Sequence, residues 1–302
     1  MLLTVVICTY RRPECLEITL ATLAAQTASR QEYTVLIVDN ADSAVTLEQA
    51  QRYGHDYVVE SRIGLSHARN RGWREAQTPW VLYLDDDIKA PRELLAAFLE
   101  RLRTAAYAAL GGHYTHWFLQ PPPAWLRKYY GPEGRKLMET SELSELPAGK
   151  YLSGGIMAVR RNLLAEVGGY GPELGMQGTK MGHGEEDQLQ DRMRQRGYRI
   201  YYDPALTMEH LVQPYKYTLS TQVRQAYSYG RATAALSYHT PPTLGRLWYR
   251  WLEITVVSLP FNLLRLLAKP GYVWQHAFLD TVNKYAYAYG RYIGPPTKPS
   301  DP

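Results

Sequence analysis

Two different spacings of hydrophobic residues alternate along the first two hundred residues. Apolar runs at residues 2–8, 34–38 and 80–84 are rich in β-branched and aromatic types and predict buried strands. Between them, Leu16, Leu20 and Leu23 follow Pro13 at helical spacing, and proline suits the first position of a helix. This order of strands and helices predicts an α/β domain whose central sheet is mostly parallel.

Polar residues stand at the carboxyl ends of these predicted strands. Thr9, Asp39 and the consecutive Asp85, Asp86 and Asp87 all occupy such positions. Ligands of open α/β sheets bind beyond these strand ends, so we expect one shared polar site. Adjacent aspartates repel one another unless a cation or solvent compensates them. Carboxylate oxygens suit Mg²⁺ or Mn²⁺, and the alternative is a solvated acidic turn before the next helix.

A second acidic segment lies further along the chain. Glu185, Glu186 and Asp187 open a predicted helix, a position that the helix dipole alone favours for acids. Gly184, just before them, leaves the backbone flexible enough to bring a carboxylate beside a ligand. His210 follows a predicted strand at residues 199–202, and a lone histidine is more often structural than a ligand.

Composition narrows the possible classes of protein. A chain of 302 residues with 45% hydrophobic content can bury one substantial core. The net charge of +5 fits a phosphate-bearing partner or an anionic membrane. Cys8 and Cys15 lack metal spacing, which favours a reducing compartment, and the first apolar run lacks the basic flank of a signal peptide. We expect a cytoplasmic protein, with peripheral attachment to the inner face of the cell membrane left open.

Two later regions differ in composition from the rest. Residues 111–134 are rich in aromatics and proline, which predicts an ordered loop or lid. The apolar stretch at residues 248–267 is interrupted by charged and polar residues, so we do not expect a membrane-spanning helix. Its neighbouring cations and tryptophans suit a helix in a membrane interface, and the alternative is an appendage packed on the catalytic domain or on a dimer partner.

Taken together, these segments resemble the family 2 glycosyltransferases of the GT-A fold. The family's order is followed by residues 6–12 (VICTYRR), 38–40 (VDN), 64–72 (GLSHARNRG), 84–87 (LDDD), 154–161 (GGIMAVRR), 168–170 (GGY), 184–187 (GEED) and 204–210 (PALTMEH). The resemblance implies a catalytic domain over residues 1–212, divided into a nucleotide-binding half (1–110) and an acceptor-binding half (111–212). Residues 213–302 then form a helical C-terminal extension, either membrane-interfacial or dimerising.

The resemblance also implies roles for individual residues. Nucleotide contacts are expected from Thr9, Tyr10, Arg11, Asp39, Arg69, Asn70, Asp85 and Asp86. Asp39 would accept hydrogen bonds from the base, Asp85 would face the ribose, and Asp86 would be ancillary. A Mn²⁺ or Mg²⁺ ion that neutralises the departing diphosphate is expected on Asp87, Asp85 and His210.

The implied reaction transfers a hexosyl group from a nucleotide-sugar, by default a UDP-sugar, to a hydroxyl of a glycan or lipid-linked acceptor. A single displacement inverts the anomeric centre and needs a carboxylate base, which the family's Glu-Asp motif supplies. We favour Asp187 as the base, with Glu186 orienting the acceptor and Glu185 leaving the assignment uncertain by one position. Acceptor contacts are expected from Gly155, Glu185 and Trp117.

Other classes of protein are weighed against this interpretation. A nucleotidyltransferase could share the fold and the aspartates, and an inactive nucleotide-sugar-binding protein could retain the site. Residues 64–68 lack the final glycine of a hydrolase nucleophile elbow. No nucleic-acid partner is expected, and a homodimer is left open.

Overall fold

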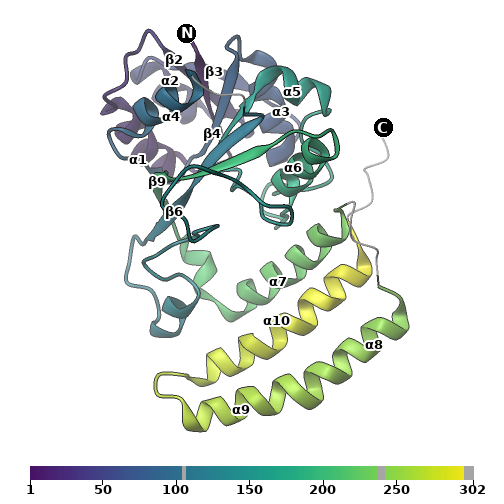
Figure 1. Ribbon diagram of the computed structural model, residues 1–302. Coiled ribbons are helices and arrows are strands. Elements are labelled where there is room, and N and C mark those ends of the chain that lie inside the picture. Colours follow the sequence, from purple (N-terminus) through teal and green to yellow (C-terminus); the bar gives the residue numbers. More distant parts are fainter. Residues whose placement is uncertain (104–106, 237–241, 296–302) are drawn as a thin grey trace. The chain divides into compact units, whose positions relative to one another are not determined.

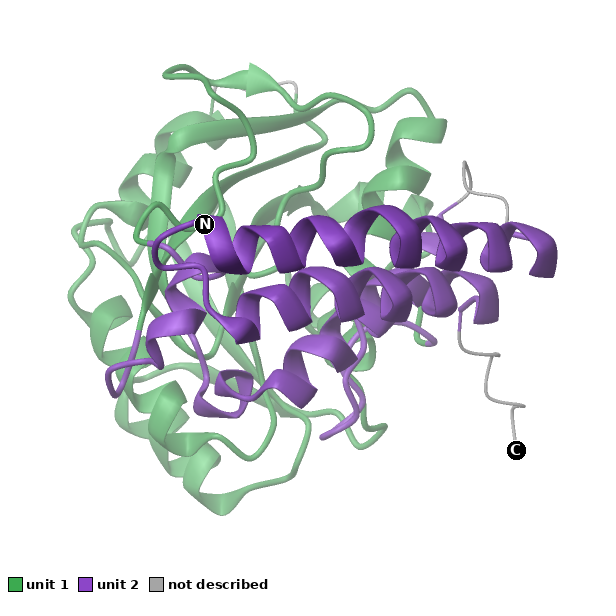
Figure 2. Cartoon of the chain, turned by 90° about the horizontal axis from the view of Figure 1, so that it is seen from below, with its two compact units in different colours: residues 1–117, 132–172, 185–211 green, residues 118–131, 173–184, 212–302 purple. Residues whose placement is uncertain are grey.

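The computed structural model describes residues 1–103, 107–236 and 242–295, and the chain divides into two compact units (Figure 2). Unit 1 comprises Met1–Trp117, Pro132–Pro172 and Glu185–Leu211. Unit 2 comprises Phe118–Gly131, Glu173–Gly184 and the chain from Val212 onward. Residues 118–131 and 173–184, which the sequence analysis placed in the catalytic domain, therefore group with the helical C-terminal region.

Unit 1 is built on a mixed sheet (Figure 1). Within the described residues this sheet has nine strands in the order β3-β2-β1-β4-β8-β6-β9-β5, and β7 pairs with β9. The strands are β1 (Leu3–Thr9), β2 (Tyr33–Asp39), β3 (Asp56–Val59), β4 (Trp80–Asp85), β5 (Ile88–Lys89), β6 (Ala109–Trp117), β7 (Ser144–Glu145), β8 (Ile156–Arg160) and β9 (Ile200–Leu211). β1 to β4 run parallel, whereas β8 runs antiparallel to β4 and β6. The predicted mixed, mostly parallel sheet is confirmed.

Helices cover both faces of this sheet because alternate strand residues point to opposite sides. One buried cluster joins Val5 and Ile7 of β1 to residues of three helices: α1 (Pro13–Ala24), α2 (Ala44–Arg52) and α4 (Leu94–Arg103). The other cluster joins Val6 of β1 to residues of α3 (Leu65–Glu75), α5 (Arg161–Glu166) and α6 (Glu185–Gln195). Each cluster therefore forms a core layer on its own side of the sheet.

The predicted loop or lid at residues 111–134 is wrong at its start, because β6 runs to Trp117. A Cβ atom on Gly112 would lie 1.6 Å from the carbonyl oxygen of Leu206, so this glycine permits a close approach of strands. The β6–β9 register shifts between Gly111 and His113, leaving Pro204 in β9 without a partner in β6. Proline has no N–H to donate, so a bulge lets β9 continue from Ile200 to Leu211.

Apart from an isolated β-bridge between Gln177 and Lys180, the regular elements among the described residues of unit 2 are helices. Its elements are η1 (Ala124–Lys128), η2 (Pro214–Tyr217), α7 (Leu219–Ala234), α8 (Leu244–Glu253), η3 (Ile254–Ser258), α9 (Leu259–Ala268) and α10 (Trp274–Ile293). Glycines allow α7 and α10 to pack closely. A Cβ atom on Gly230 would lie 2.2 Å from the Tyr287 carbonyl oxygen, and one on Gly290 would lie 2.1 Å from that of Tyr227.

α8, η3 and α9 form one continuous helix, Leu244–Ala268. Among the described parts of the chain, it is the helix whose length and composition would allow it to cross a membrane. Length and composition alone do not test whether it crosses one, so the expectation that its polar residues disfavour a membrane-spanning helix stays a prediction. Its middle turn, η3, is a π-helix that directly precedes the α9 segment containing Pro260. A widened turn of this kind accommodates a residue that lacks an N–H.

Thr19 provides a test of how α1 is fixed to β5. Its buried hydroxyl donates to the Ile88 carbonyl at 3.1 Å and accepts from the Ile88 N–H at 3.0 Å. Thr19→Val keeps the shape but leaves both groups unpaired, so we expect a loss of about 2 kcal/mol in the free energy of unfolding, measured with urea. The control Thr27→Val removes an exposed hydrogen bond to Arg92, which water replaces. Equal losses for both variants would contradict this account.

Candidate functional site

The carboxyl ends of β1, β2 and β4 meet at one edge of the sheet. In the parallel ladders, Thr9 pairs with Asp39 and Cys8 pairs with Asp85. The three strand ends that the sequence singled out are therefore brought together by strand register. Thr9 and Asp39 are buried, as are Asp86 and Asp87 beyond β4.

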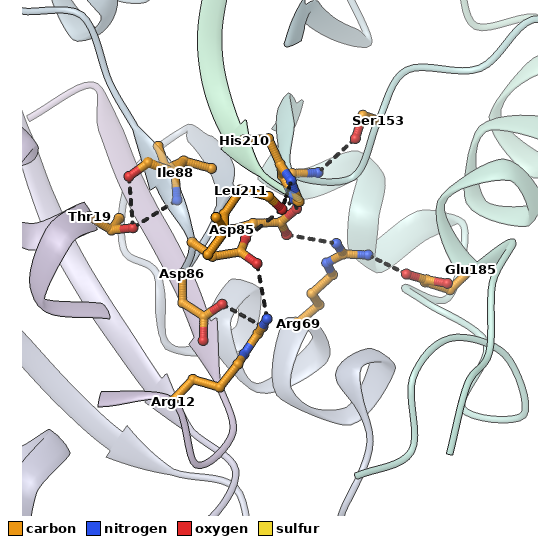
Figure 3. Close-up of polar contacts among 12 residues, drawn as sticks. Arg12, Thr19, Arg69, Asp85, Asp86, Ile88, Ser153, Glu185, His210 and Leu211 are labelled. Atoms are coloured by element: carbon orange, nitrogen blue, oxygen red, sulfur yellow. Dashed lines mark hydrogen bonds and ion pairs between the residues drawn. The ribbon is translucent and has the colours of Figure 1, made fainter. Parts of the chain in front are cut away.

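Asp85, Asp87 and His210 form a cluster at this edge. Figure 3 labels Asp85 and His210 of this cluster. The Nε2 atom of His210 lies 3.2 Å from Asp85 Oδ2 and 3.3 Å from Asp87 Oδ1. One ligand atom from each residue lies within 4.8 Å of the others. His210 is 123 positions from Asp87 in the chain (210 minus 87), and the β5–β9 pair, in which His210 faces Ile88, brings it there. The Leu211 N–H also donates to the Asp87 carbonyl at 2.9 Å.

The chemistry of these three groups fits a cation. His210 Nδ1 lies 3.0 Å from the Leu211 carbonyl oxygen, which can only accept, so we assign the ring hydrogen to Nδ1. In a neutral imidazole, Nε2 then presents a lone pair to two carboxylates. Such a set of acceptors needs either a proton on Nε2 or a metal ion among them. Two carboxylates and an imidazole suit Mn²⁺ and also Mg²⁺, and a partner on Nδ1 is typical of a ligating histidine.

Charged neighbours keep Asp85 ionised. Burial alone would raise the pKa of Asp85, but His210 when it is protonated, through its hydrogen bond and charge, and the charges of Arg69 and Arg12 hold this pKa well below its ordinary value. Asp86 behaves differently. Burial and the charge of Asp87 raise its pKa to about 6, against the opposing charge of Arg12. Its Oδ2 accepts a hydrogen bond from the Thr9 hydroxyl at 2.7 Å.

Arg12 is a site residue to which the sequence analysis gave no role. Its guanidinium lies 2.5 Å from Asp86 Oδ1 and 3.0 Å from Asp87 Oδ2. The charge of Asp86 raises the pKa of Arg12 above its ordinary value. The side chain is nevertheless 40% exposed, so it can also reach a ligand. The sequence did offer one sign of this role. Arg12 ends the VICTYRR segment and directly follows the predicted nucleotide contacts Thr9, Tyr10 and Arg11.

Arg69 connects the aspartate cluster to α6. Its buried guanidinium donates to Glu185 Oε1 at 2.7 Å and lies 3.6 Å from Asp85 Oδ1. It also lies over the Tyr170 ring, 5.4 Å from the ring centre. A Cβ atom on Gly154 would come within 2.7 Å of this guanidinium. These contacts hold Arg69 beside Asp85, and its predicted direct contact with a nucleotide stays a prediction.

Glu185 is the buried partner of Arg69. Burial, followed by the charge of Glu186, raises the pKa of Glu185 well above its ordinary value, although Arg69 opposes this. Asn70 is likewise engaged inside the fold. Its side chain donates to the Tyr170 carbonyl at 2.8 Å and accepts from the Tyr170 N–H at 2.8 Å. These bonds hold both side chains inside the fold, and the predicted acceptor contact of Glu185 and nucleotide contact of Asn70 stay predictions.

Asp39 is also occupied by local hydrogen bonds. Its carboxylate accepts from the N–H groups of Ala41 and Ser43 at 2.8 and 2.7 Å, and from the Tyr57 hydroxyl at 3.0 Å. This arrangement fixes the loop after β2. Contact with a nucleotide base stays a prediction.

Three further predicted residues lie at the ends of β1 and β6. Arg11 is exposed and has φ 54°, an uncommon conformation for a residue other than glycine. Its guanidinium lies 5.3 Å from the centre of the Tyr10 ring. Trp117 ends β6, and the Lys89 ammonium lies 3.8 Å from the centre of its ring. Their predicted ligand contacts stay untested.

Glu186 and Asp187 lie in the first turn of α6. Burial and the charge of Glu186 raise the pKa of Asp187 to about 7, against the charges of Arg135 and Arg194. Such a carboxylate can accept a proton near neutral pH. Glu186 is half-buried, and one of its oxygens, Oε2, is buried without a hydrogen-bond partner among the described residues.

Gly155 provides a test of whether the cluster of Asp85, Asp87 and His210 binds a metal ion. A Cβ atom at this position would lie 2.0 Å from Asp85 Oδ2, so Gly155→Ala forces the carboxylate away from His210. We expect at least about a tenfold loss of Mn²⁺ affinity, measured by calorimetry. The control is Gly245→Ala, where a Cβ atom meets nothing within 4 Å. Unchanged Mn²⁺ affinity in Gly155→Ala would argue against Asp85 as a ligand.

Comparisons with solved structures support the fold. A mannosyltransferase from Pyrobaculum calidifontis, in complex with GDP-Man and Mn²⁺, superposes with a TM-score of 0.64 at 20% identity, over 96% of this chain and 86% of that one. S. aureus TarS 1-349, in complex with UDP-GlcNAc, gives a TM-score of 0.56 at 15% identity, over 95% and 90% of the two chains. At these identities the likeness shows the fold, and the predicted GT-A architecture is confirmed.

Curated relatives match different shares of the chain. A glucosyl-dolichyl phosphate glucuronosyltransferase from Haloferax volcanii is 26% identical over 225 residues, 72% of this chain and 71% of that protein. Validoxylamine A glucosyltransferase from Streptomyces hygroscopicus subsp. jinggangensis is 33% identical over 104 residues, 32% of this chain and only 25% of that relative's length. Residues 4–168, more than half of the chain, match the family profile for glycosyl transferase family 2. The chain therefore belongs to glycosyl transferase family 2.

Proposed function

We propose that this protein is a glycosyltransferase that transfers a sugar from a nucleotide-sugar, with UDP-sugar as the expected donor, to a hydroxyl of a glycan or lipid-linked acceptor. The observation that carries the proposal is the cluster of Asp85, Asp87 and His210 at the carboxyl edge of the sheet. Ligands of α/β sheets bind at this edge. The complexes of two structural neighbours with GDP-Man and UDP-GlcNAc support a nucleotide-sugar donor.

Asp85, Asp87 and His210 would hold Mn²⁺ or Mg²⁺. A bound ion supplies positive charge that neutralises the departing diphosphate. Arg12, which is charged and partly exposed beside Asp87, would add a guanidinium suited to phosphate oxygens. Arg69 would keep Asp85 in place, since its buried charge lies between Asp85 and Glu185.

Asp187 would act as the general base. Its raised pKa of about 7 lets it remove the proton of the acceptor hydroxyl as that oxygen attacks the anomeric carbon. A single displacement inverts the anomeric centre and forms no glycosyl-enzyme intermediate. Glu186 would orient the acceptor through its half-buried carboxylate. Glu185 is the weaker candidate for the base because it is buried against Arg69.

The relatives support the proposed class of acceptor. The Haloferax protein is named for a dolichyl phosphate substrate, and a relative from Rhizobium meliloti, 33% identical over 128 residues, is named a succinoglycan biosynthesis protein. We extend the proposal to a cytoplasmic location, which the free thiols Cys8 and Cys15 support.

A donor screen tests this function. UDP- and GDP-sugars are incubated with the protein and candidate acceptors, with and without Mn²⁺, and the released nucleotide is identified. We expect release of nucleoside diphosphate that requires the metal and is nearly lost in Asp87→Asn, because this substitution removes a ligand charge opposing the diphosphate. In a parallel incubation with a nucleoside triphosphate and a sugar 1-phosphate, release of pyrophosphate would indicate a nucleotidyltransferase instead. Binding of the nucleotide-sugar with no release for any acceptor would indicate an inactive binding protein.

The pH dependence of turnover tests the proposed base. Because the pKa of Asp187 is raised to about 7, turnover should fall as pH decreases through this value and the carboxylate takes up a proton. Asp187→Asn should lower turnover about 10² to 10⁴-fold, remove this acidic limb and preserve donor affinity. Glu186→Gln should mainly weaken acceptor affinity. Near-normal turnover of Asp187→Asn would exclude Asp187 as the base.

A further inference from the structure

The helix Leu244–Ala268 of unit 2 has one packed face and one solvent-exposed face. Leu247, Ile254 and Asn262 are buried along one side. The opposite side contains Tyr249, Leu252, Val256, Leu263 and Leu267, which are between 49% and 86% exposed. Their spacing of mostly three and four residues places them along one stripe. We call this stripe the apolar face of unit 2.

The exposed hydrophobic residues of this helix form a continuous surface and are not scattered singly. Further exposed hydrophobic side chains of the same helix lie beside the stripe: Trp248, Val257, Phe261 and Leu264. A helix of 25 residues is about 37 Å long at a rise of 1.5 Å per residue. Continuous apolar surfaces of this extent usually mark a site of contact with a membrane or another protein.

A basic groove lies along one flank of this helix. The groove has a volume of about 650 Å³ and is lined by residues of α7, α8 and α10, four of them cationic: Arg246, Arg250, Lys284 and Arg291. The described residues that line it include no Asp or Glu. Glu253 pairs with Arg250 at 2.5 Å, which leaves an excess of positive charge. Arg291 Nε and Asn283 Oδ1 are buried without hydrogen-bond partners among the described residues.

We propose that the apolar face of unit 2 docks on an anionic lipid bilayer, with the cations of the basic groove on lipid phosphates. An apolar stripe flanked by arginine and lysine is typical of a helix that lies in a membrane interface. Trp248 and Trp274 are both exposed, and tryptophan is enriched at this depth. A second copy of the chain suits the surface less well, since a two-fold contact places a surface against itself and brings its own cations together.

The helix lies in the interface and does not cross the bilayer. Its buried side is bonded to polar residues, because Asn262 donates to the Thr281 hydroxyl at 2.9 Å and accepts from the Tyr272 hydroxyl at 3.3 Å. The neighbouring α10 also carries Asp280 and Lys284. If the helix crossed the bilayer, these polar groups would enter the hydrocarbon core or the helix would have to separate from α10. Both changes are unfavourable. Lying flat exposes only the apolar face to lipid.

Sedimentation with lipid vesicles tests the proposal without using enzyme activity. The full chain should sediment with vesicles of phosphatidylcholine and phosphatidylglycerol at low salt and bind weakly to phosphatidylcholine alone. Val256→Glu and Leu263→Glu should each reduce partitioning at least about tenfold, because a charge enters the apolar region. The matched control is Val45→Glu, which adds the same charge at a 50% exposed valine of α2 in unit 1 and should leave partitioning unchanged.

A second set of substitutions tests the role of the basic groove. Arg246→Gln and Arg250→Gln should each lower partitioning about fivefold and reduce its dependence on salt, whereas Arg92→Gln, at an exposed arginine of unit 1, should not. Circular dichroism verifies folding of every variant. Full-length protein that stays in the supernatant at low salt would overturn the proposal. A different outcome would also overturn it: the protein is a dimer by light scattering, Leu263→Glu dissociates this dimer, and the protein binds no vesicles. The apolar face would then be covered by a second copy of the chain.

Discussion

The buried guanidinium of Arg69 is the contact on which the arrangement of the site depends. A buried charge is tolerated when it is paired and hydrogen-bonded, and Arg69 meets this need with Glu185 on one side and Asp85 on the other. The end of β4 and the start of α6 are thereby tied to α3. Gly154 and Gly155 leave room for the pair of Arg69 and Asp85. A Cβ atom on Gly154 would clash with Arg69, and one on Gly155 would clash with Asp85. The proposed metal site and the proposed base on α6 therefore belong to one charge network.

The sheet contributes the remaining ligand. β9 returns beside β5 in antiparallel register, which sets His210 opposite Ile88 and next to the aspartates that follow β4. The bulge at Gly111–His113 and the unpaired Pro204 allow β9 to be long enough for this. Arg12 approaches from the other side, after β1, and balances Asp86 and Asp87. Acidic groups that would repel one another are thus held together by cations from distant parts of the chain.

Sequence patterns predicted what depends on local spacing. The strand ends at Thr9, Asp39 and Asp85 to Asp87 follow from the alternation of apolar runs and from the geometry of parallel sheets. The spacing around His210 marked it only as a lone histidine, because the β5–β9 pairing joins distant parts of the chain. The family resemblance was needed to propose His210 as a metal ligand. The start of β6 was predicted as part of a loop because residues 111–134 are rich in aromatics and proline. In the fold, Gly112 instead permits close contact between β6 and Leu206. The internal bonds of Asn70 and Glu185 depend on tertiary packing that spacing does not encode.

The central claim is that Asp85, Asp87 and His210 hold a divalent cation next to the nucleotide. An anomalous-difference map from crystals grown with Mn²⁺ and a nucleoside diphosphate tests it most directly. The account predicts one peak within coordination distance of an oxygen of each aspartate and of His210 Nε2, with the diphosphate on its open side. A nucleotide bound with no peak at this cluster, or with a peak at Glu185 to Asp187 instead, would contradict it.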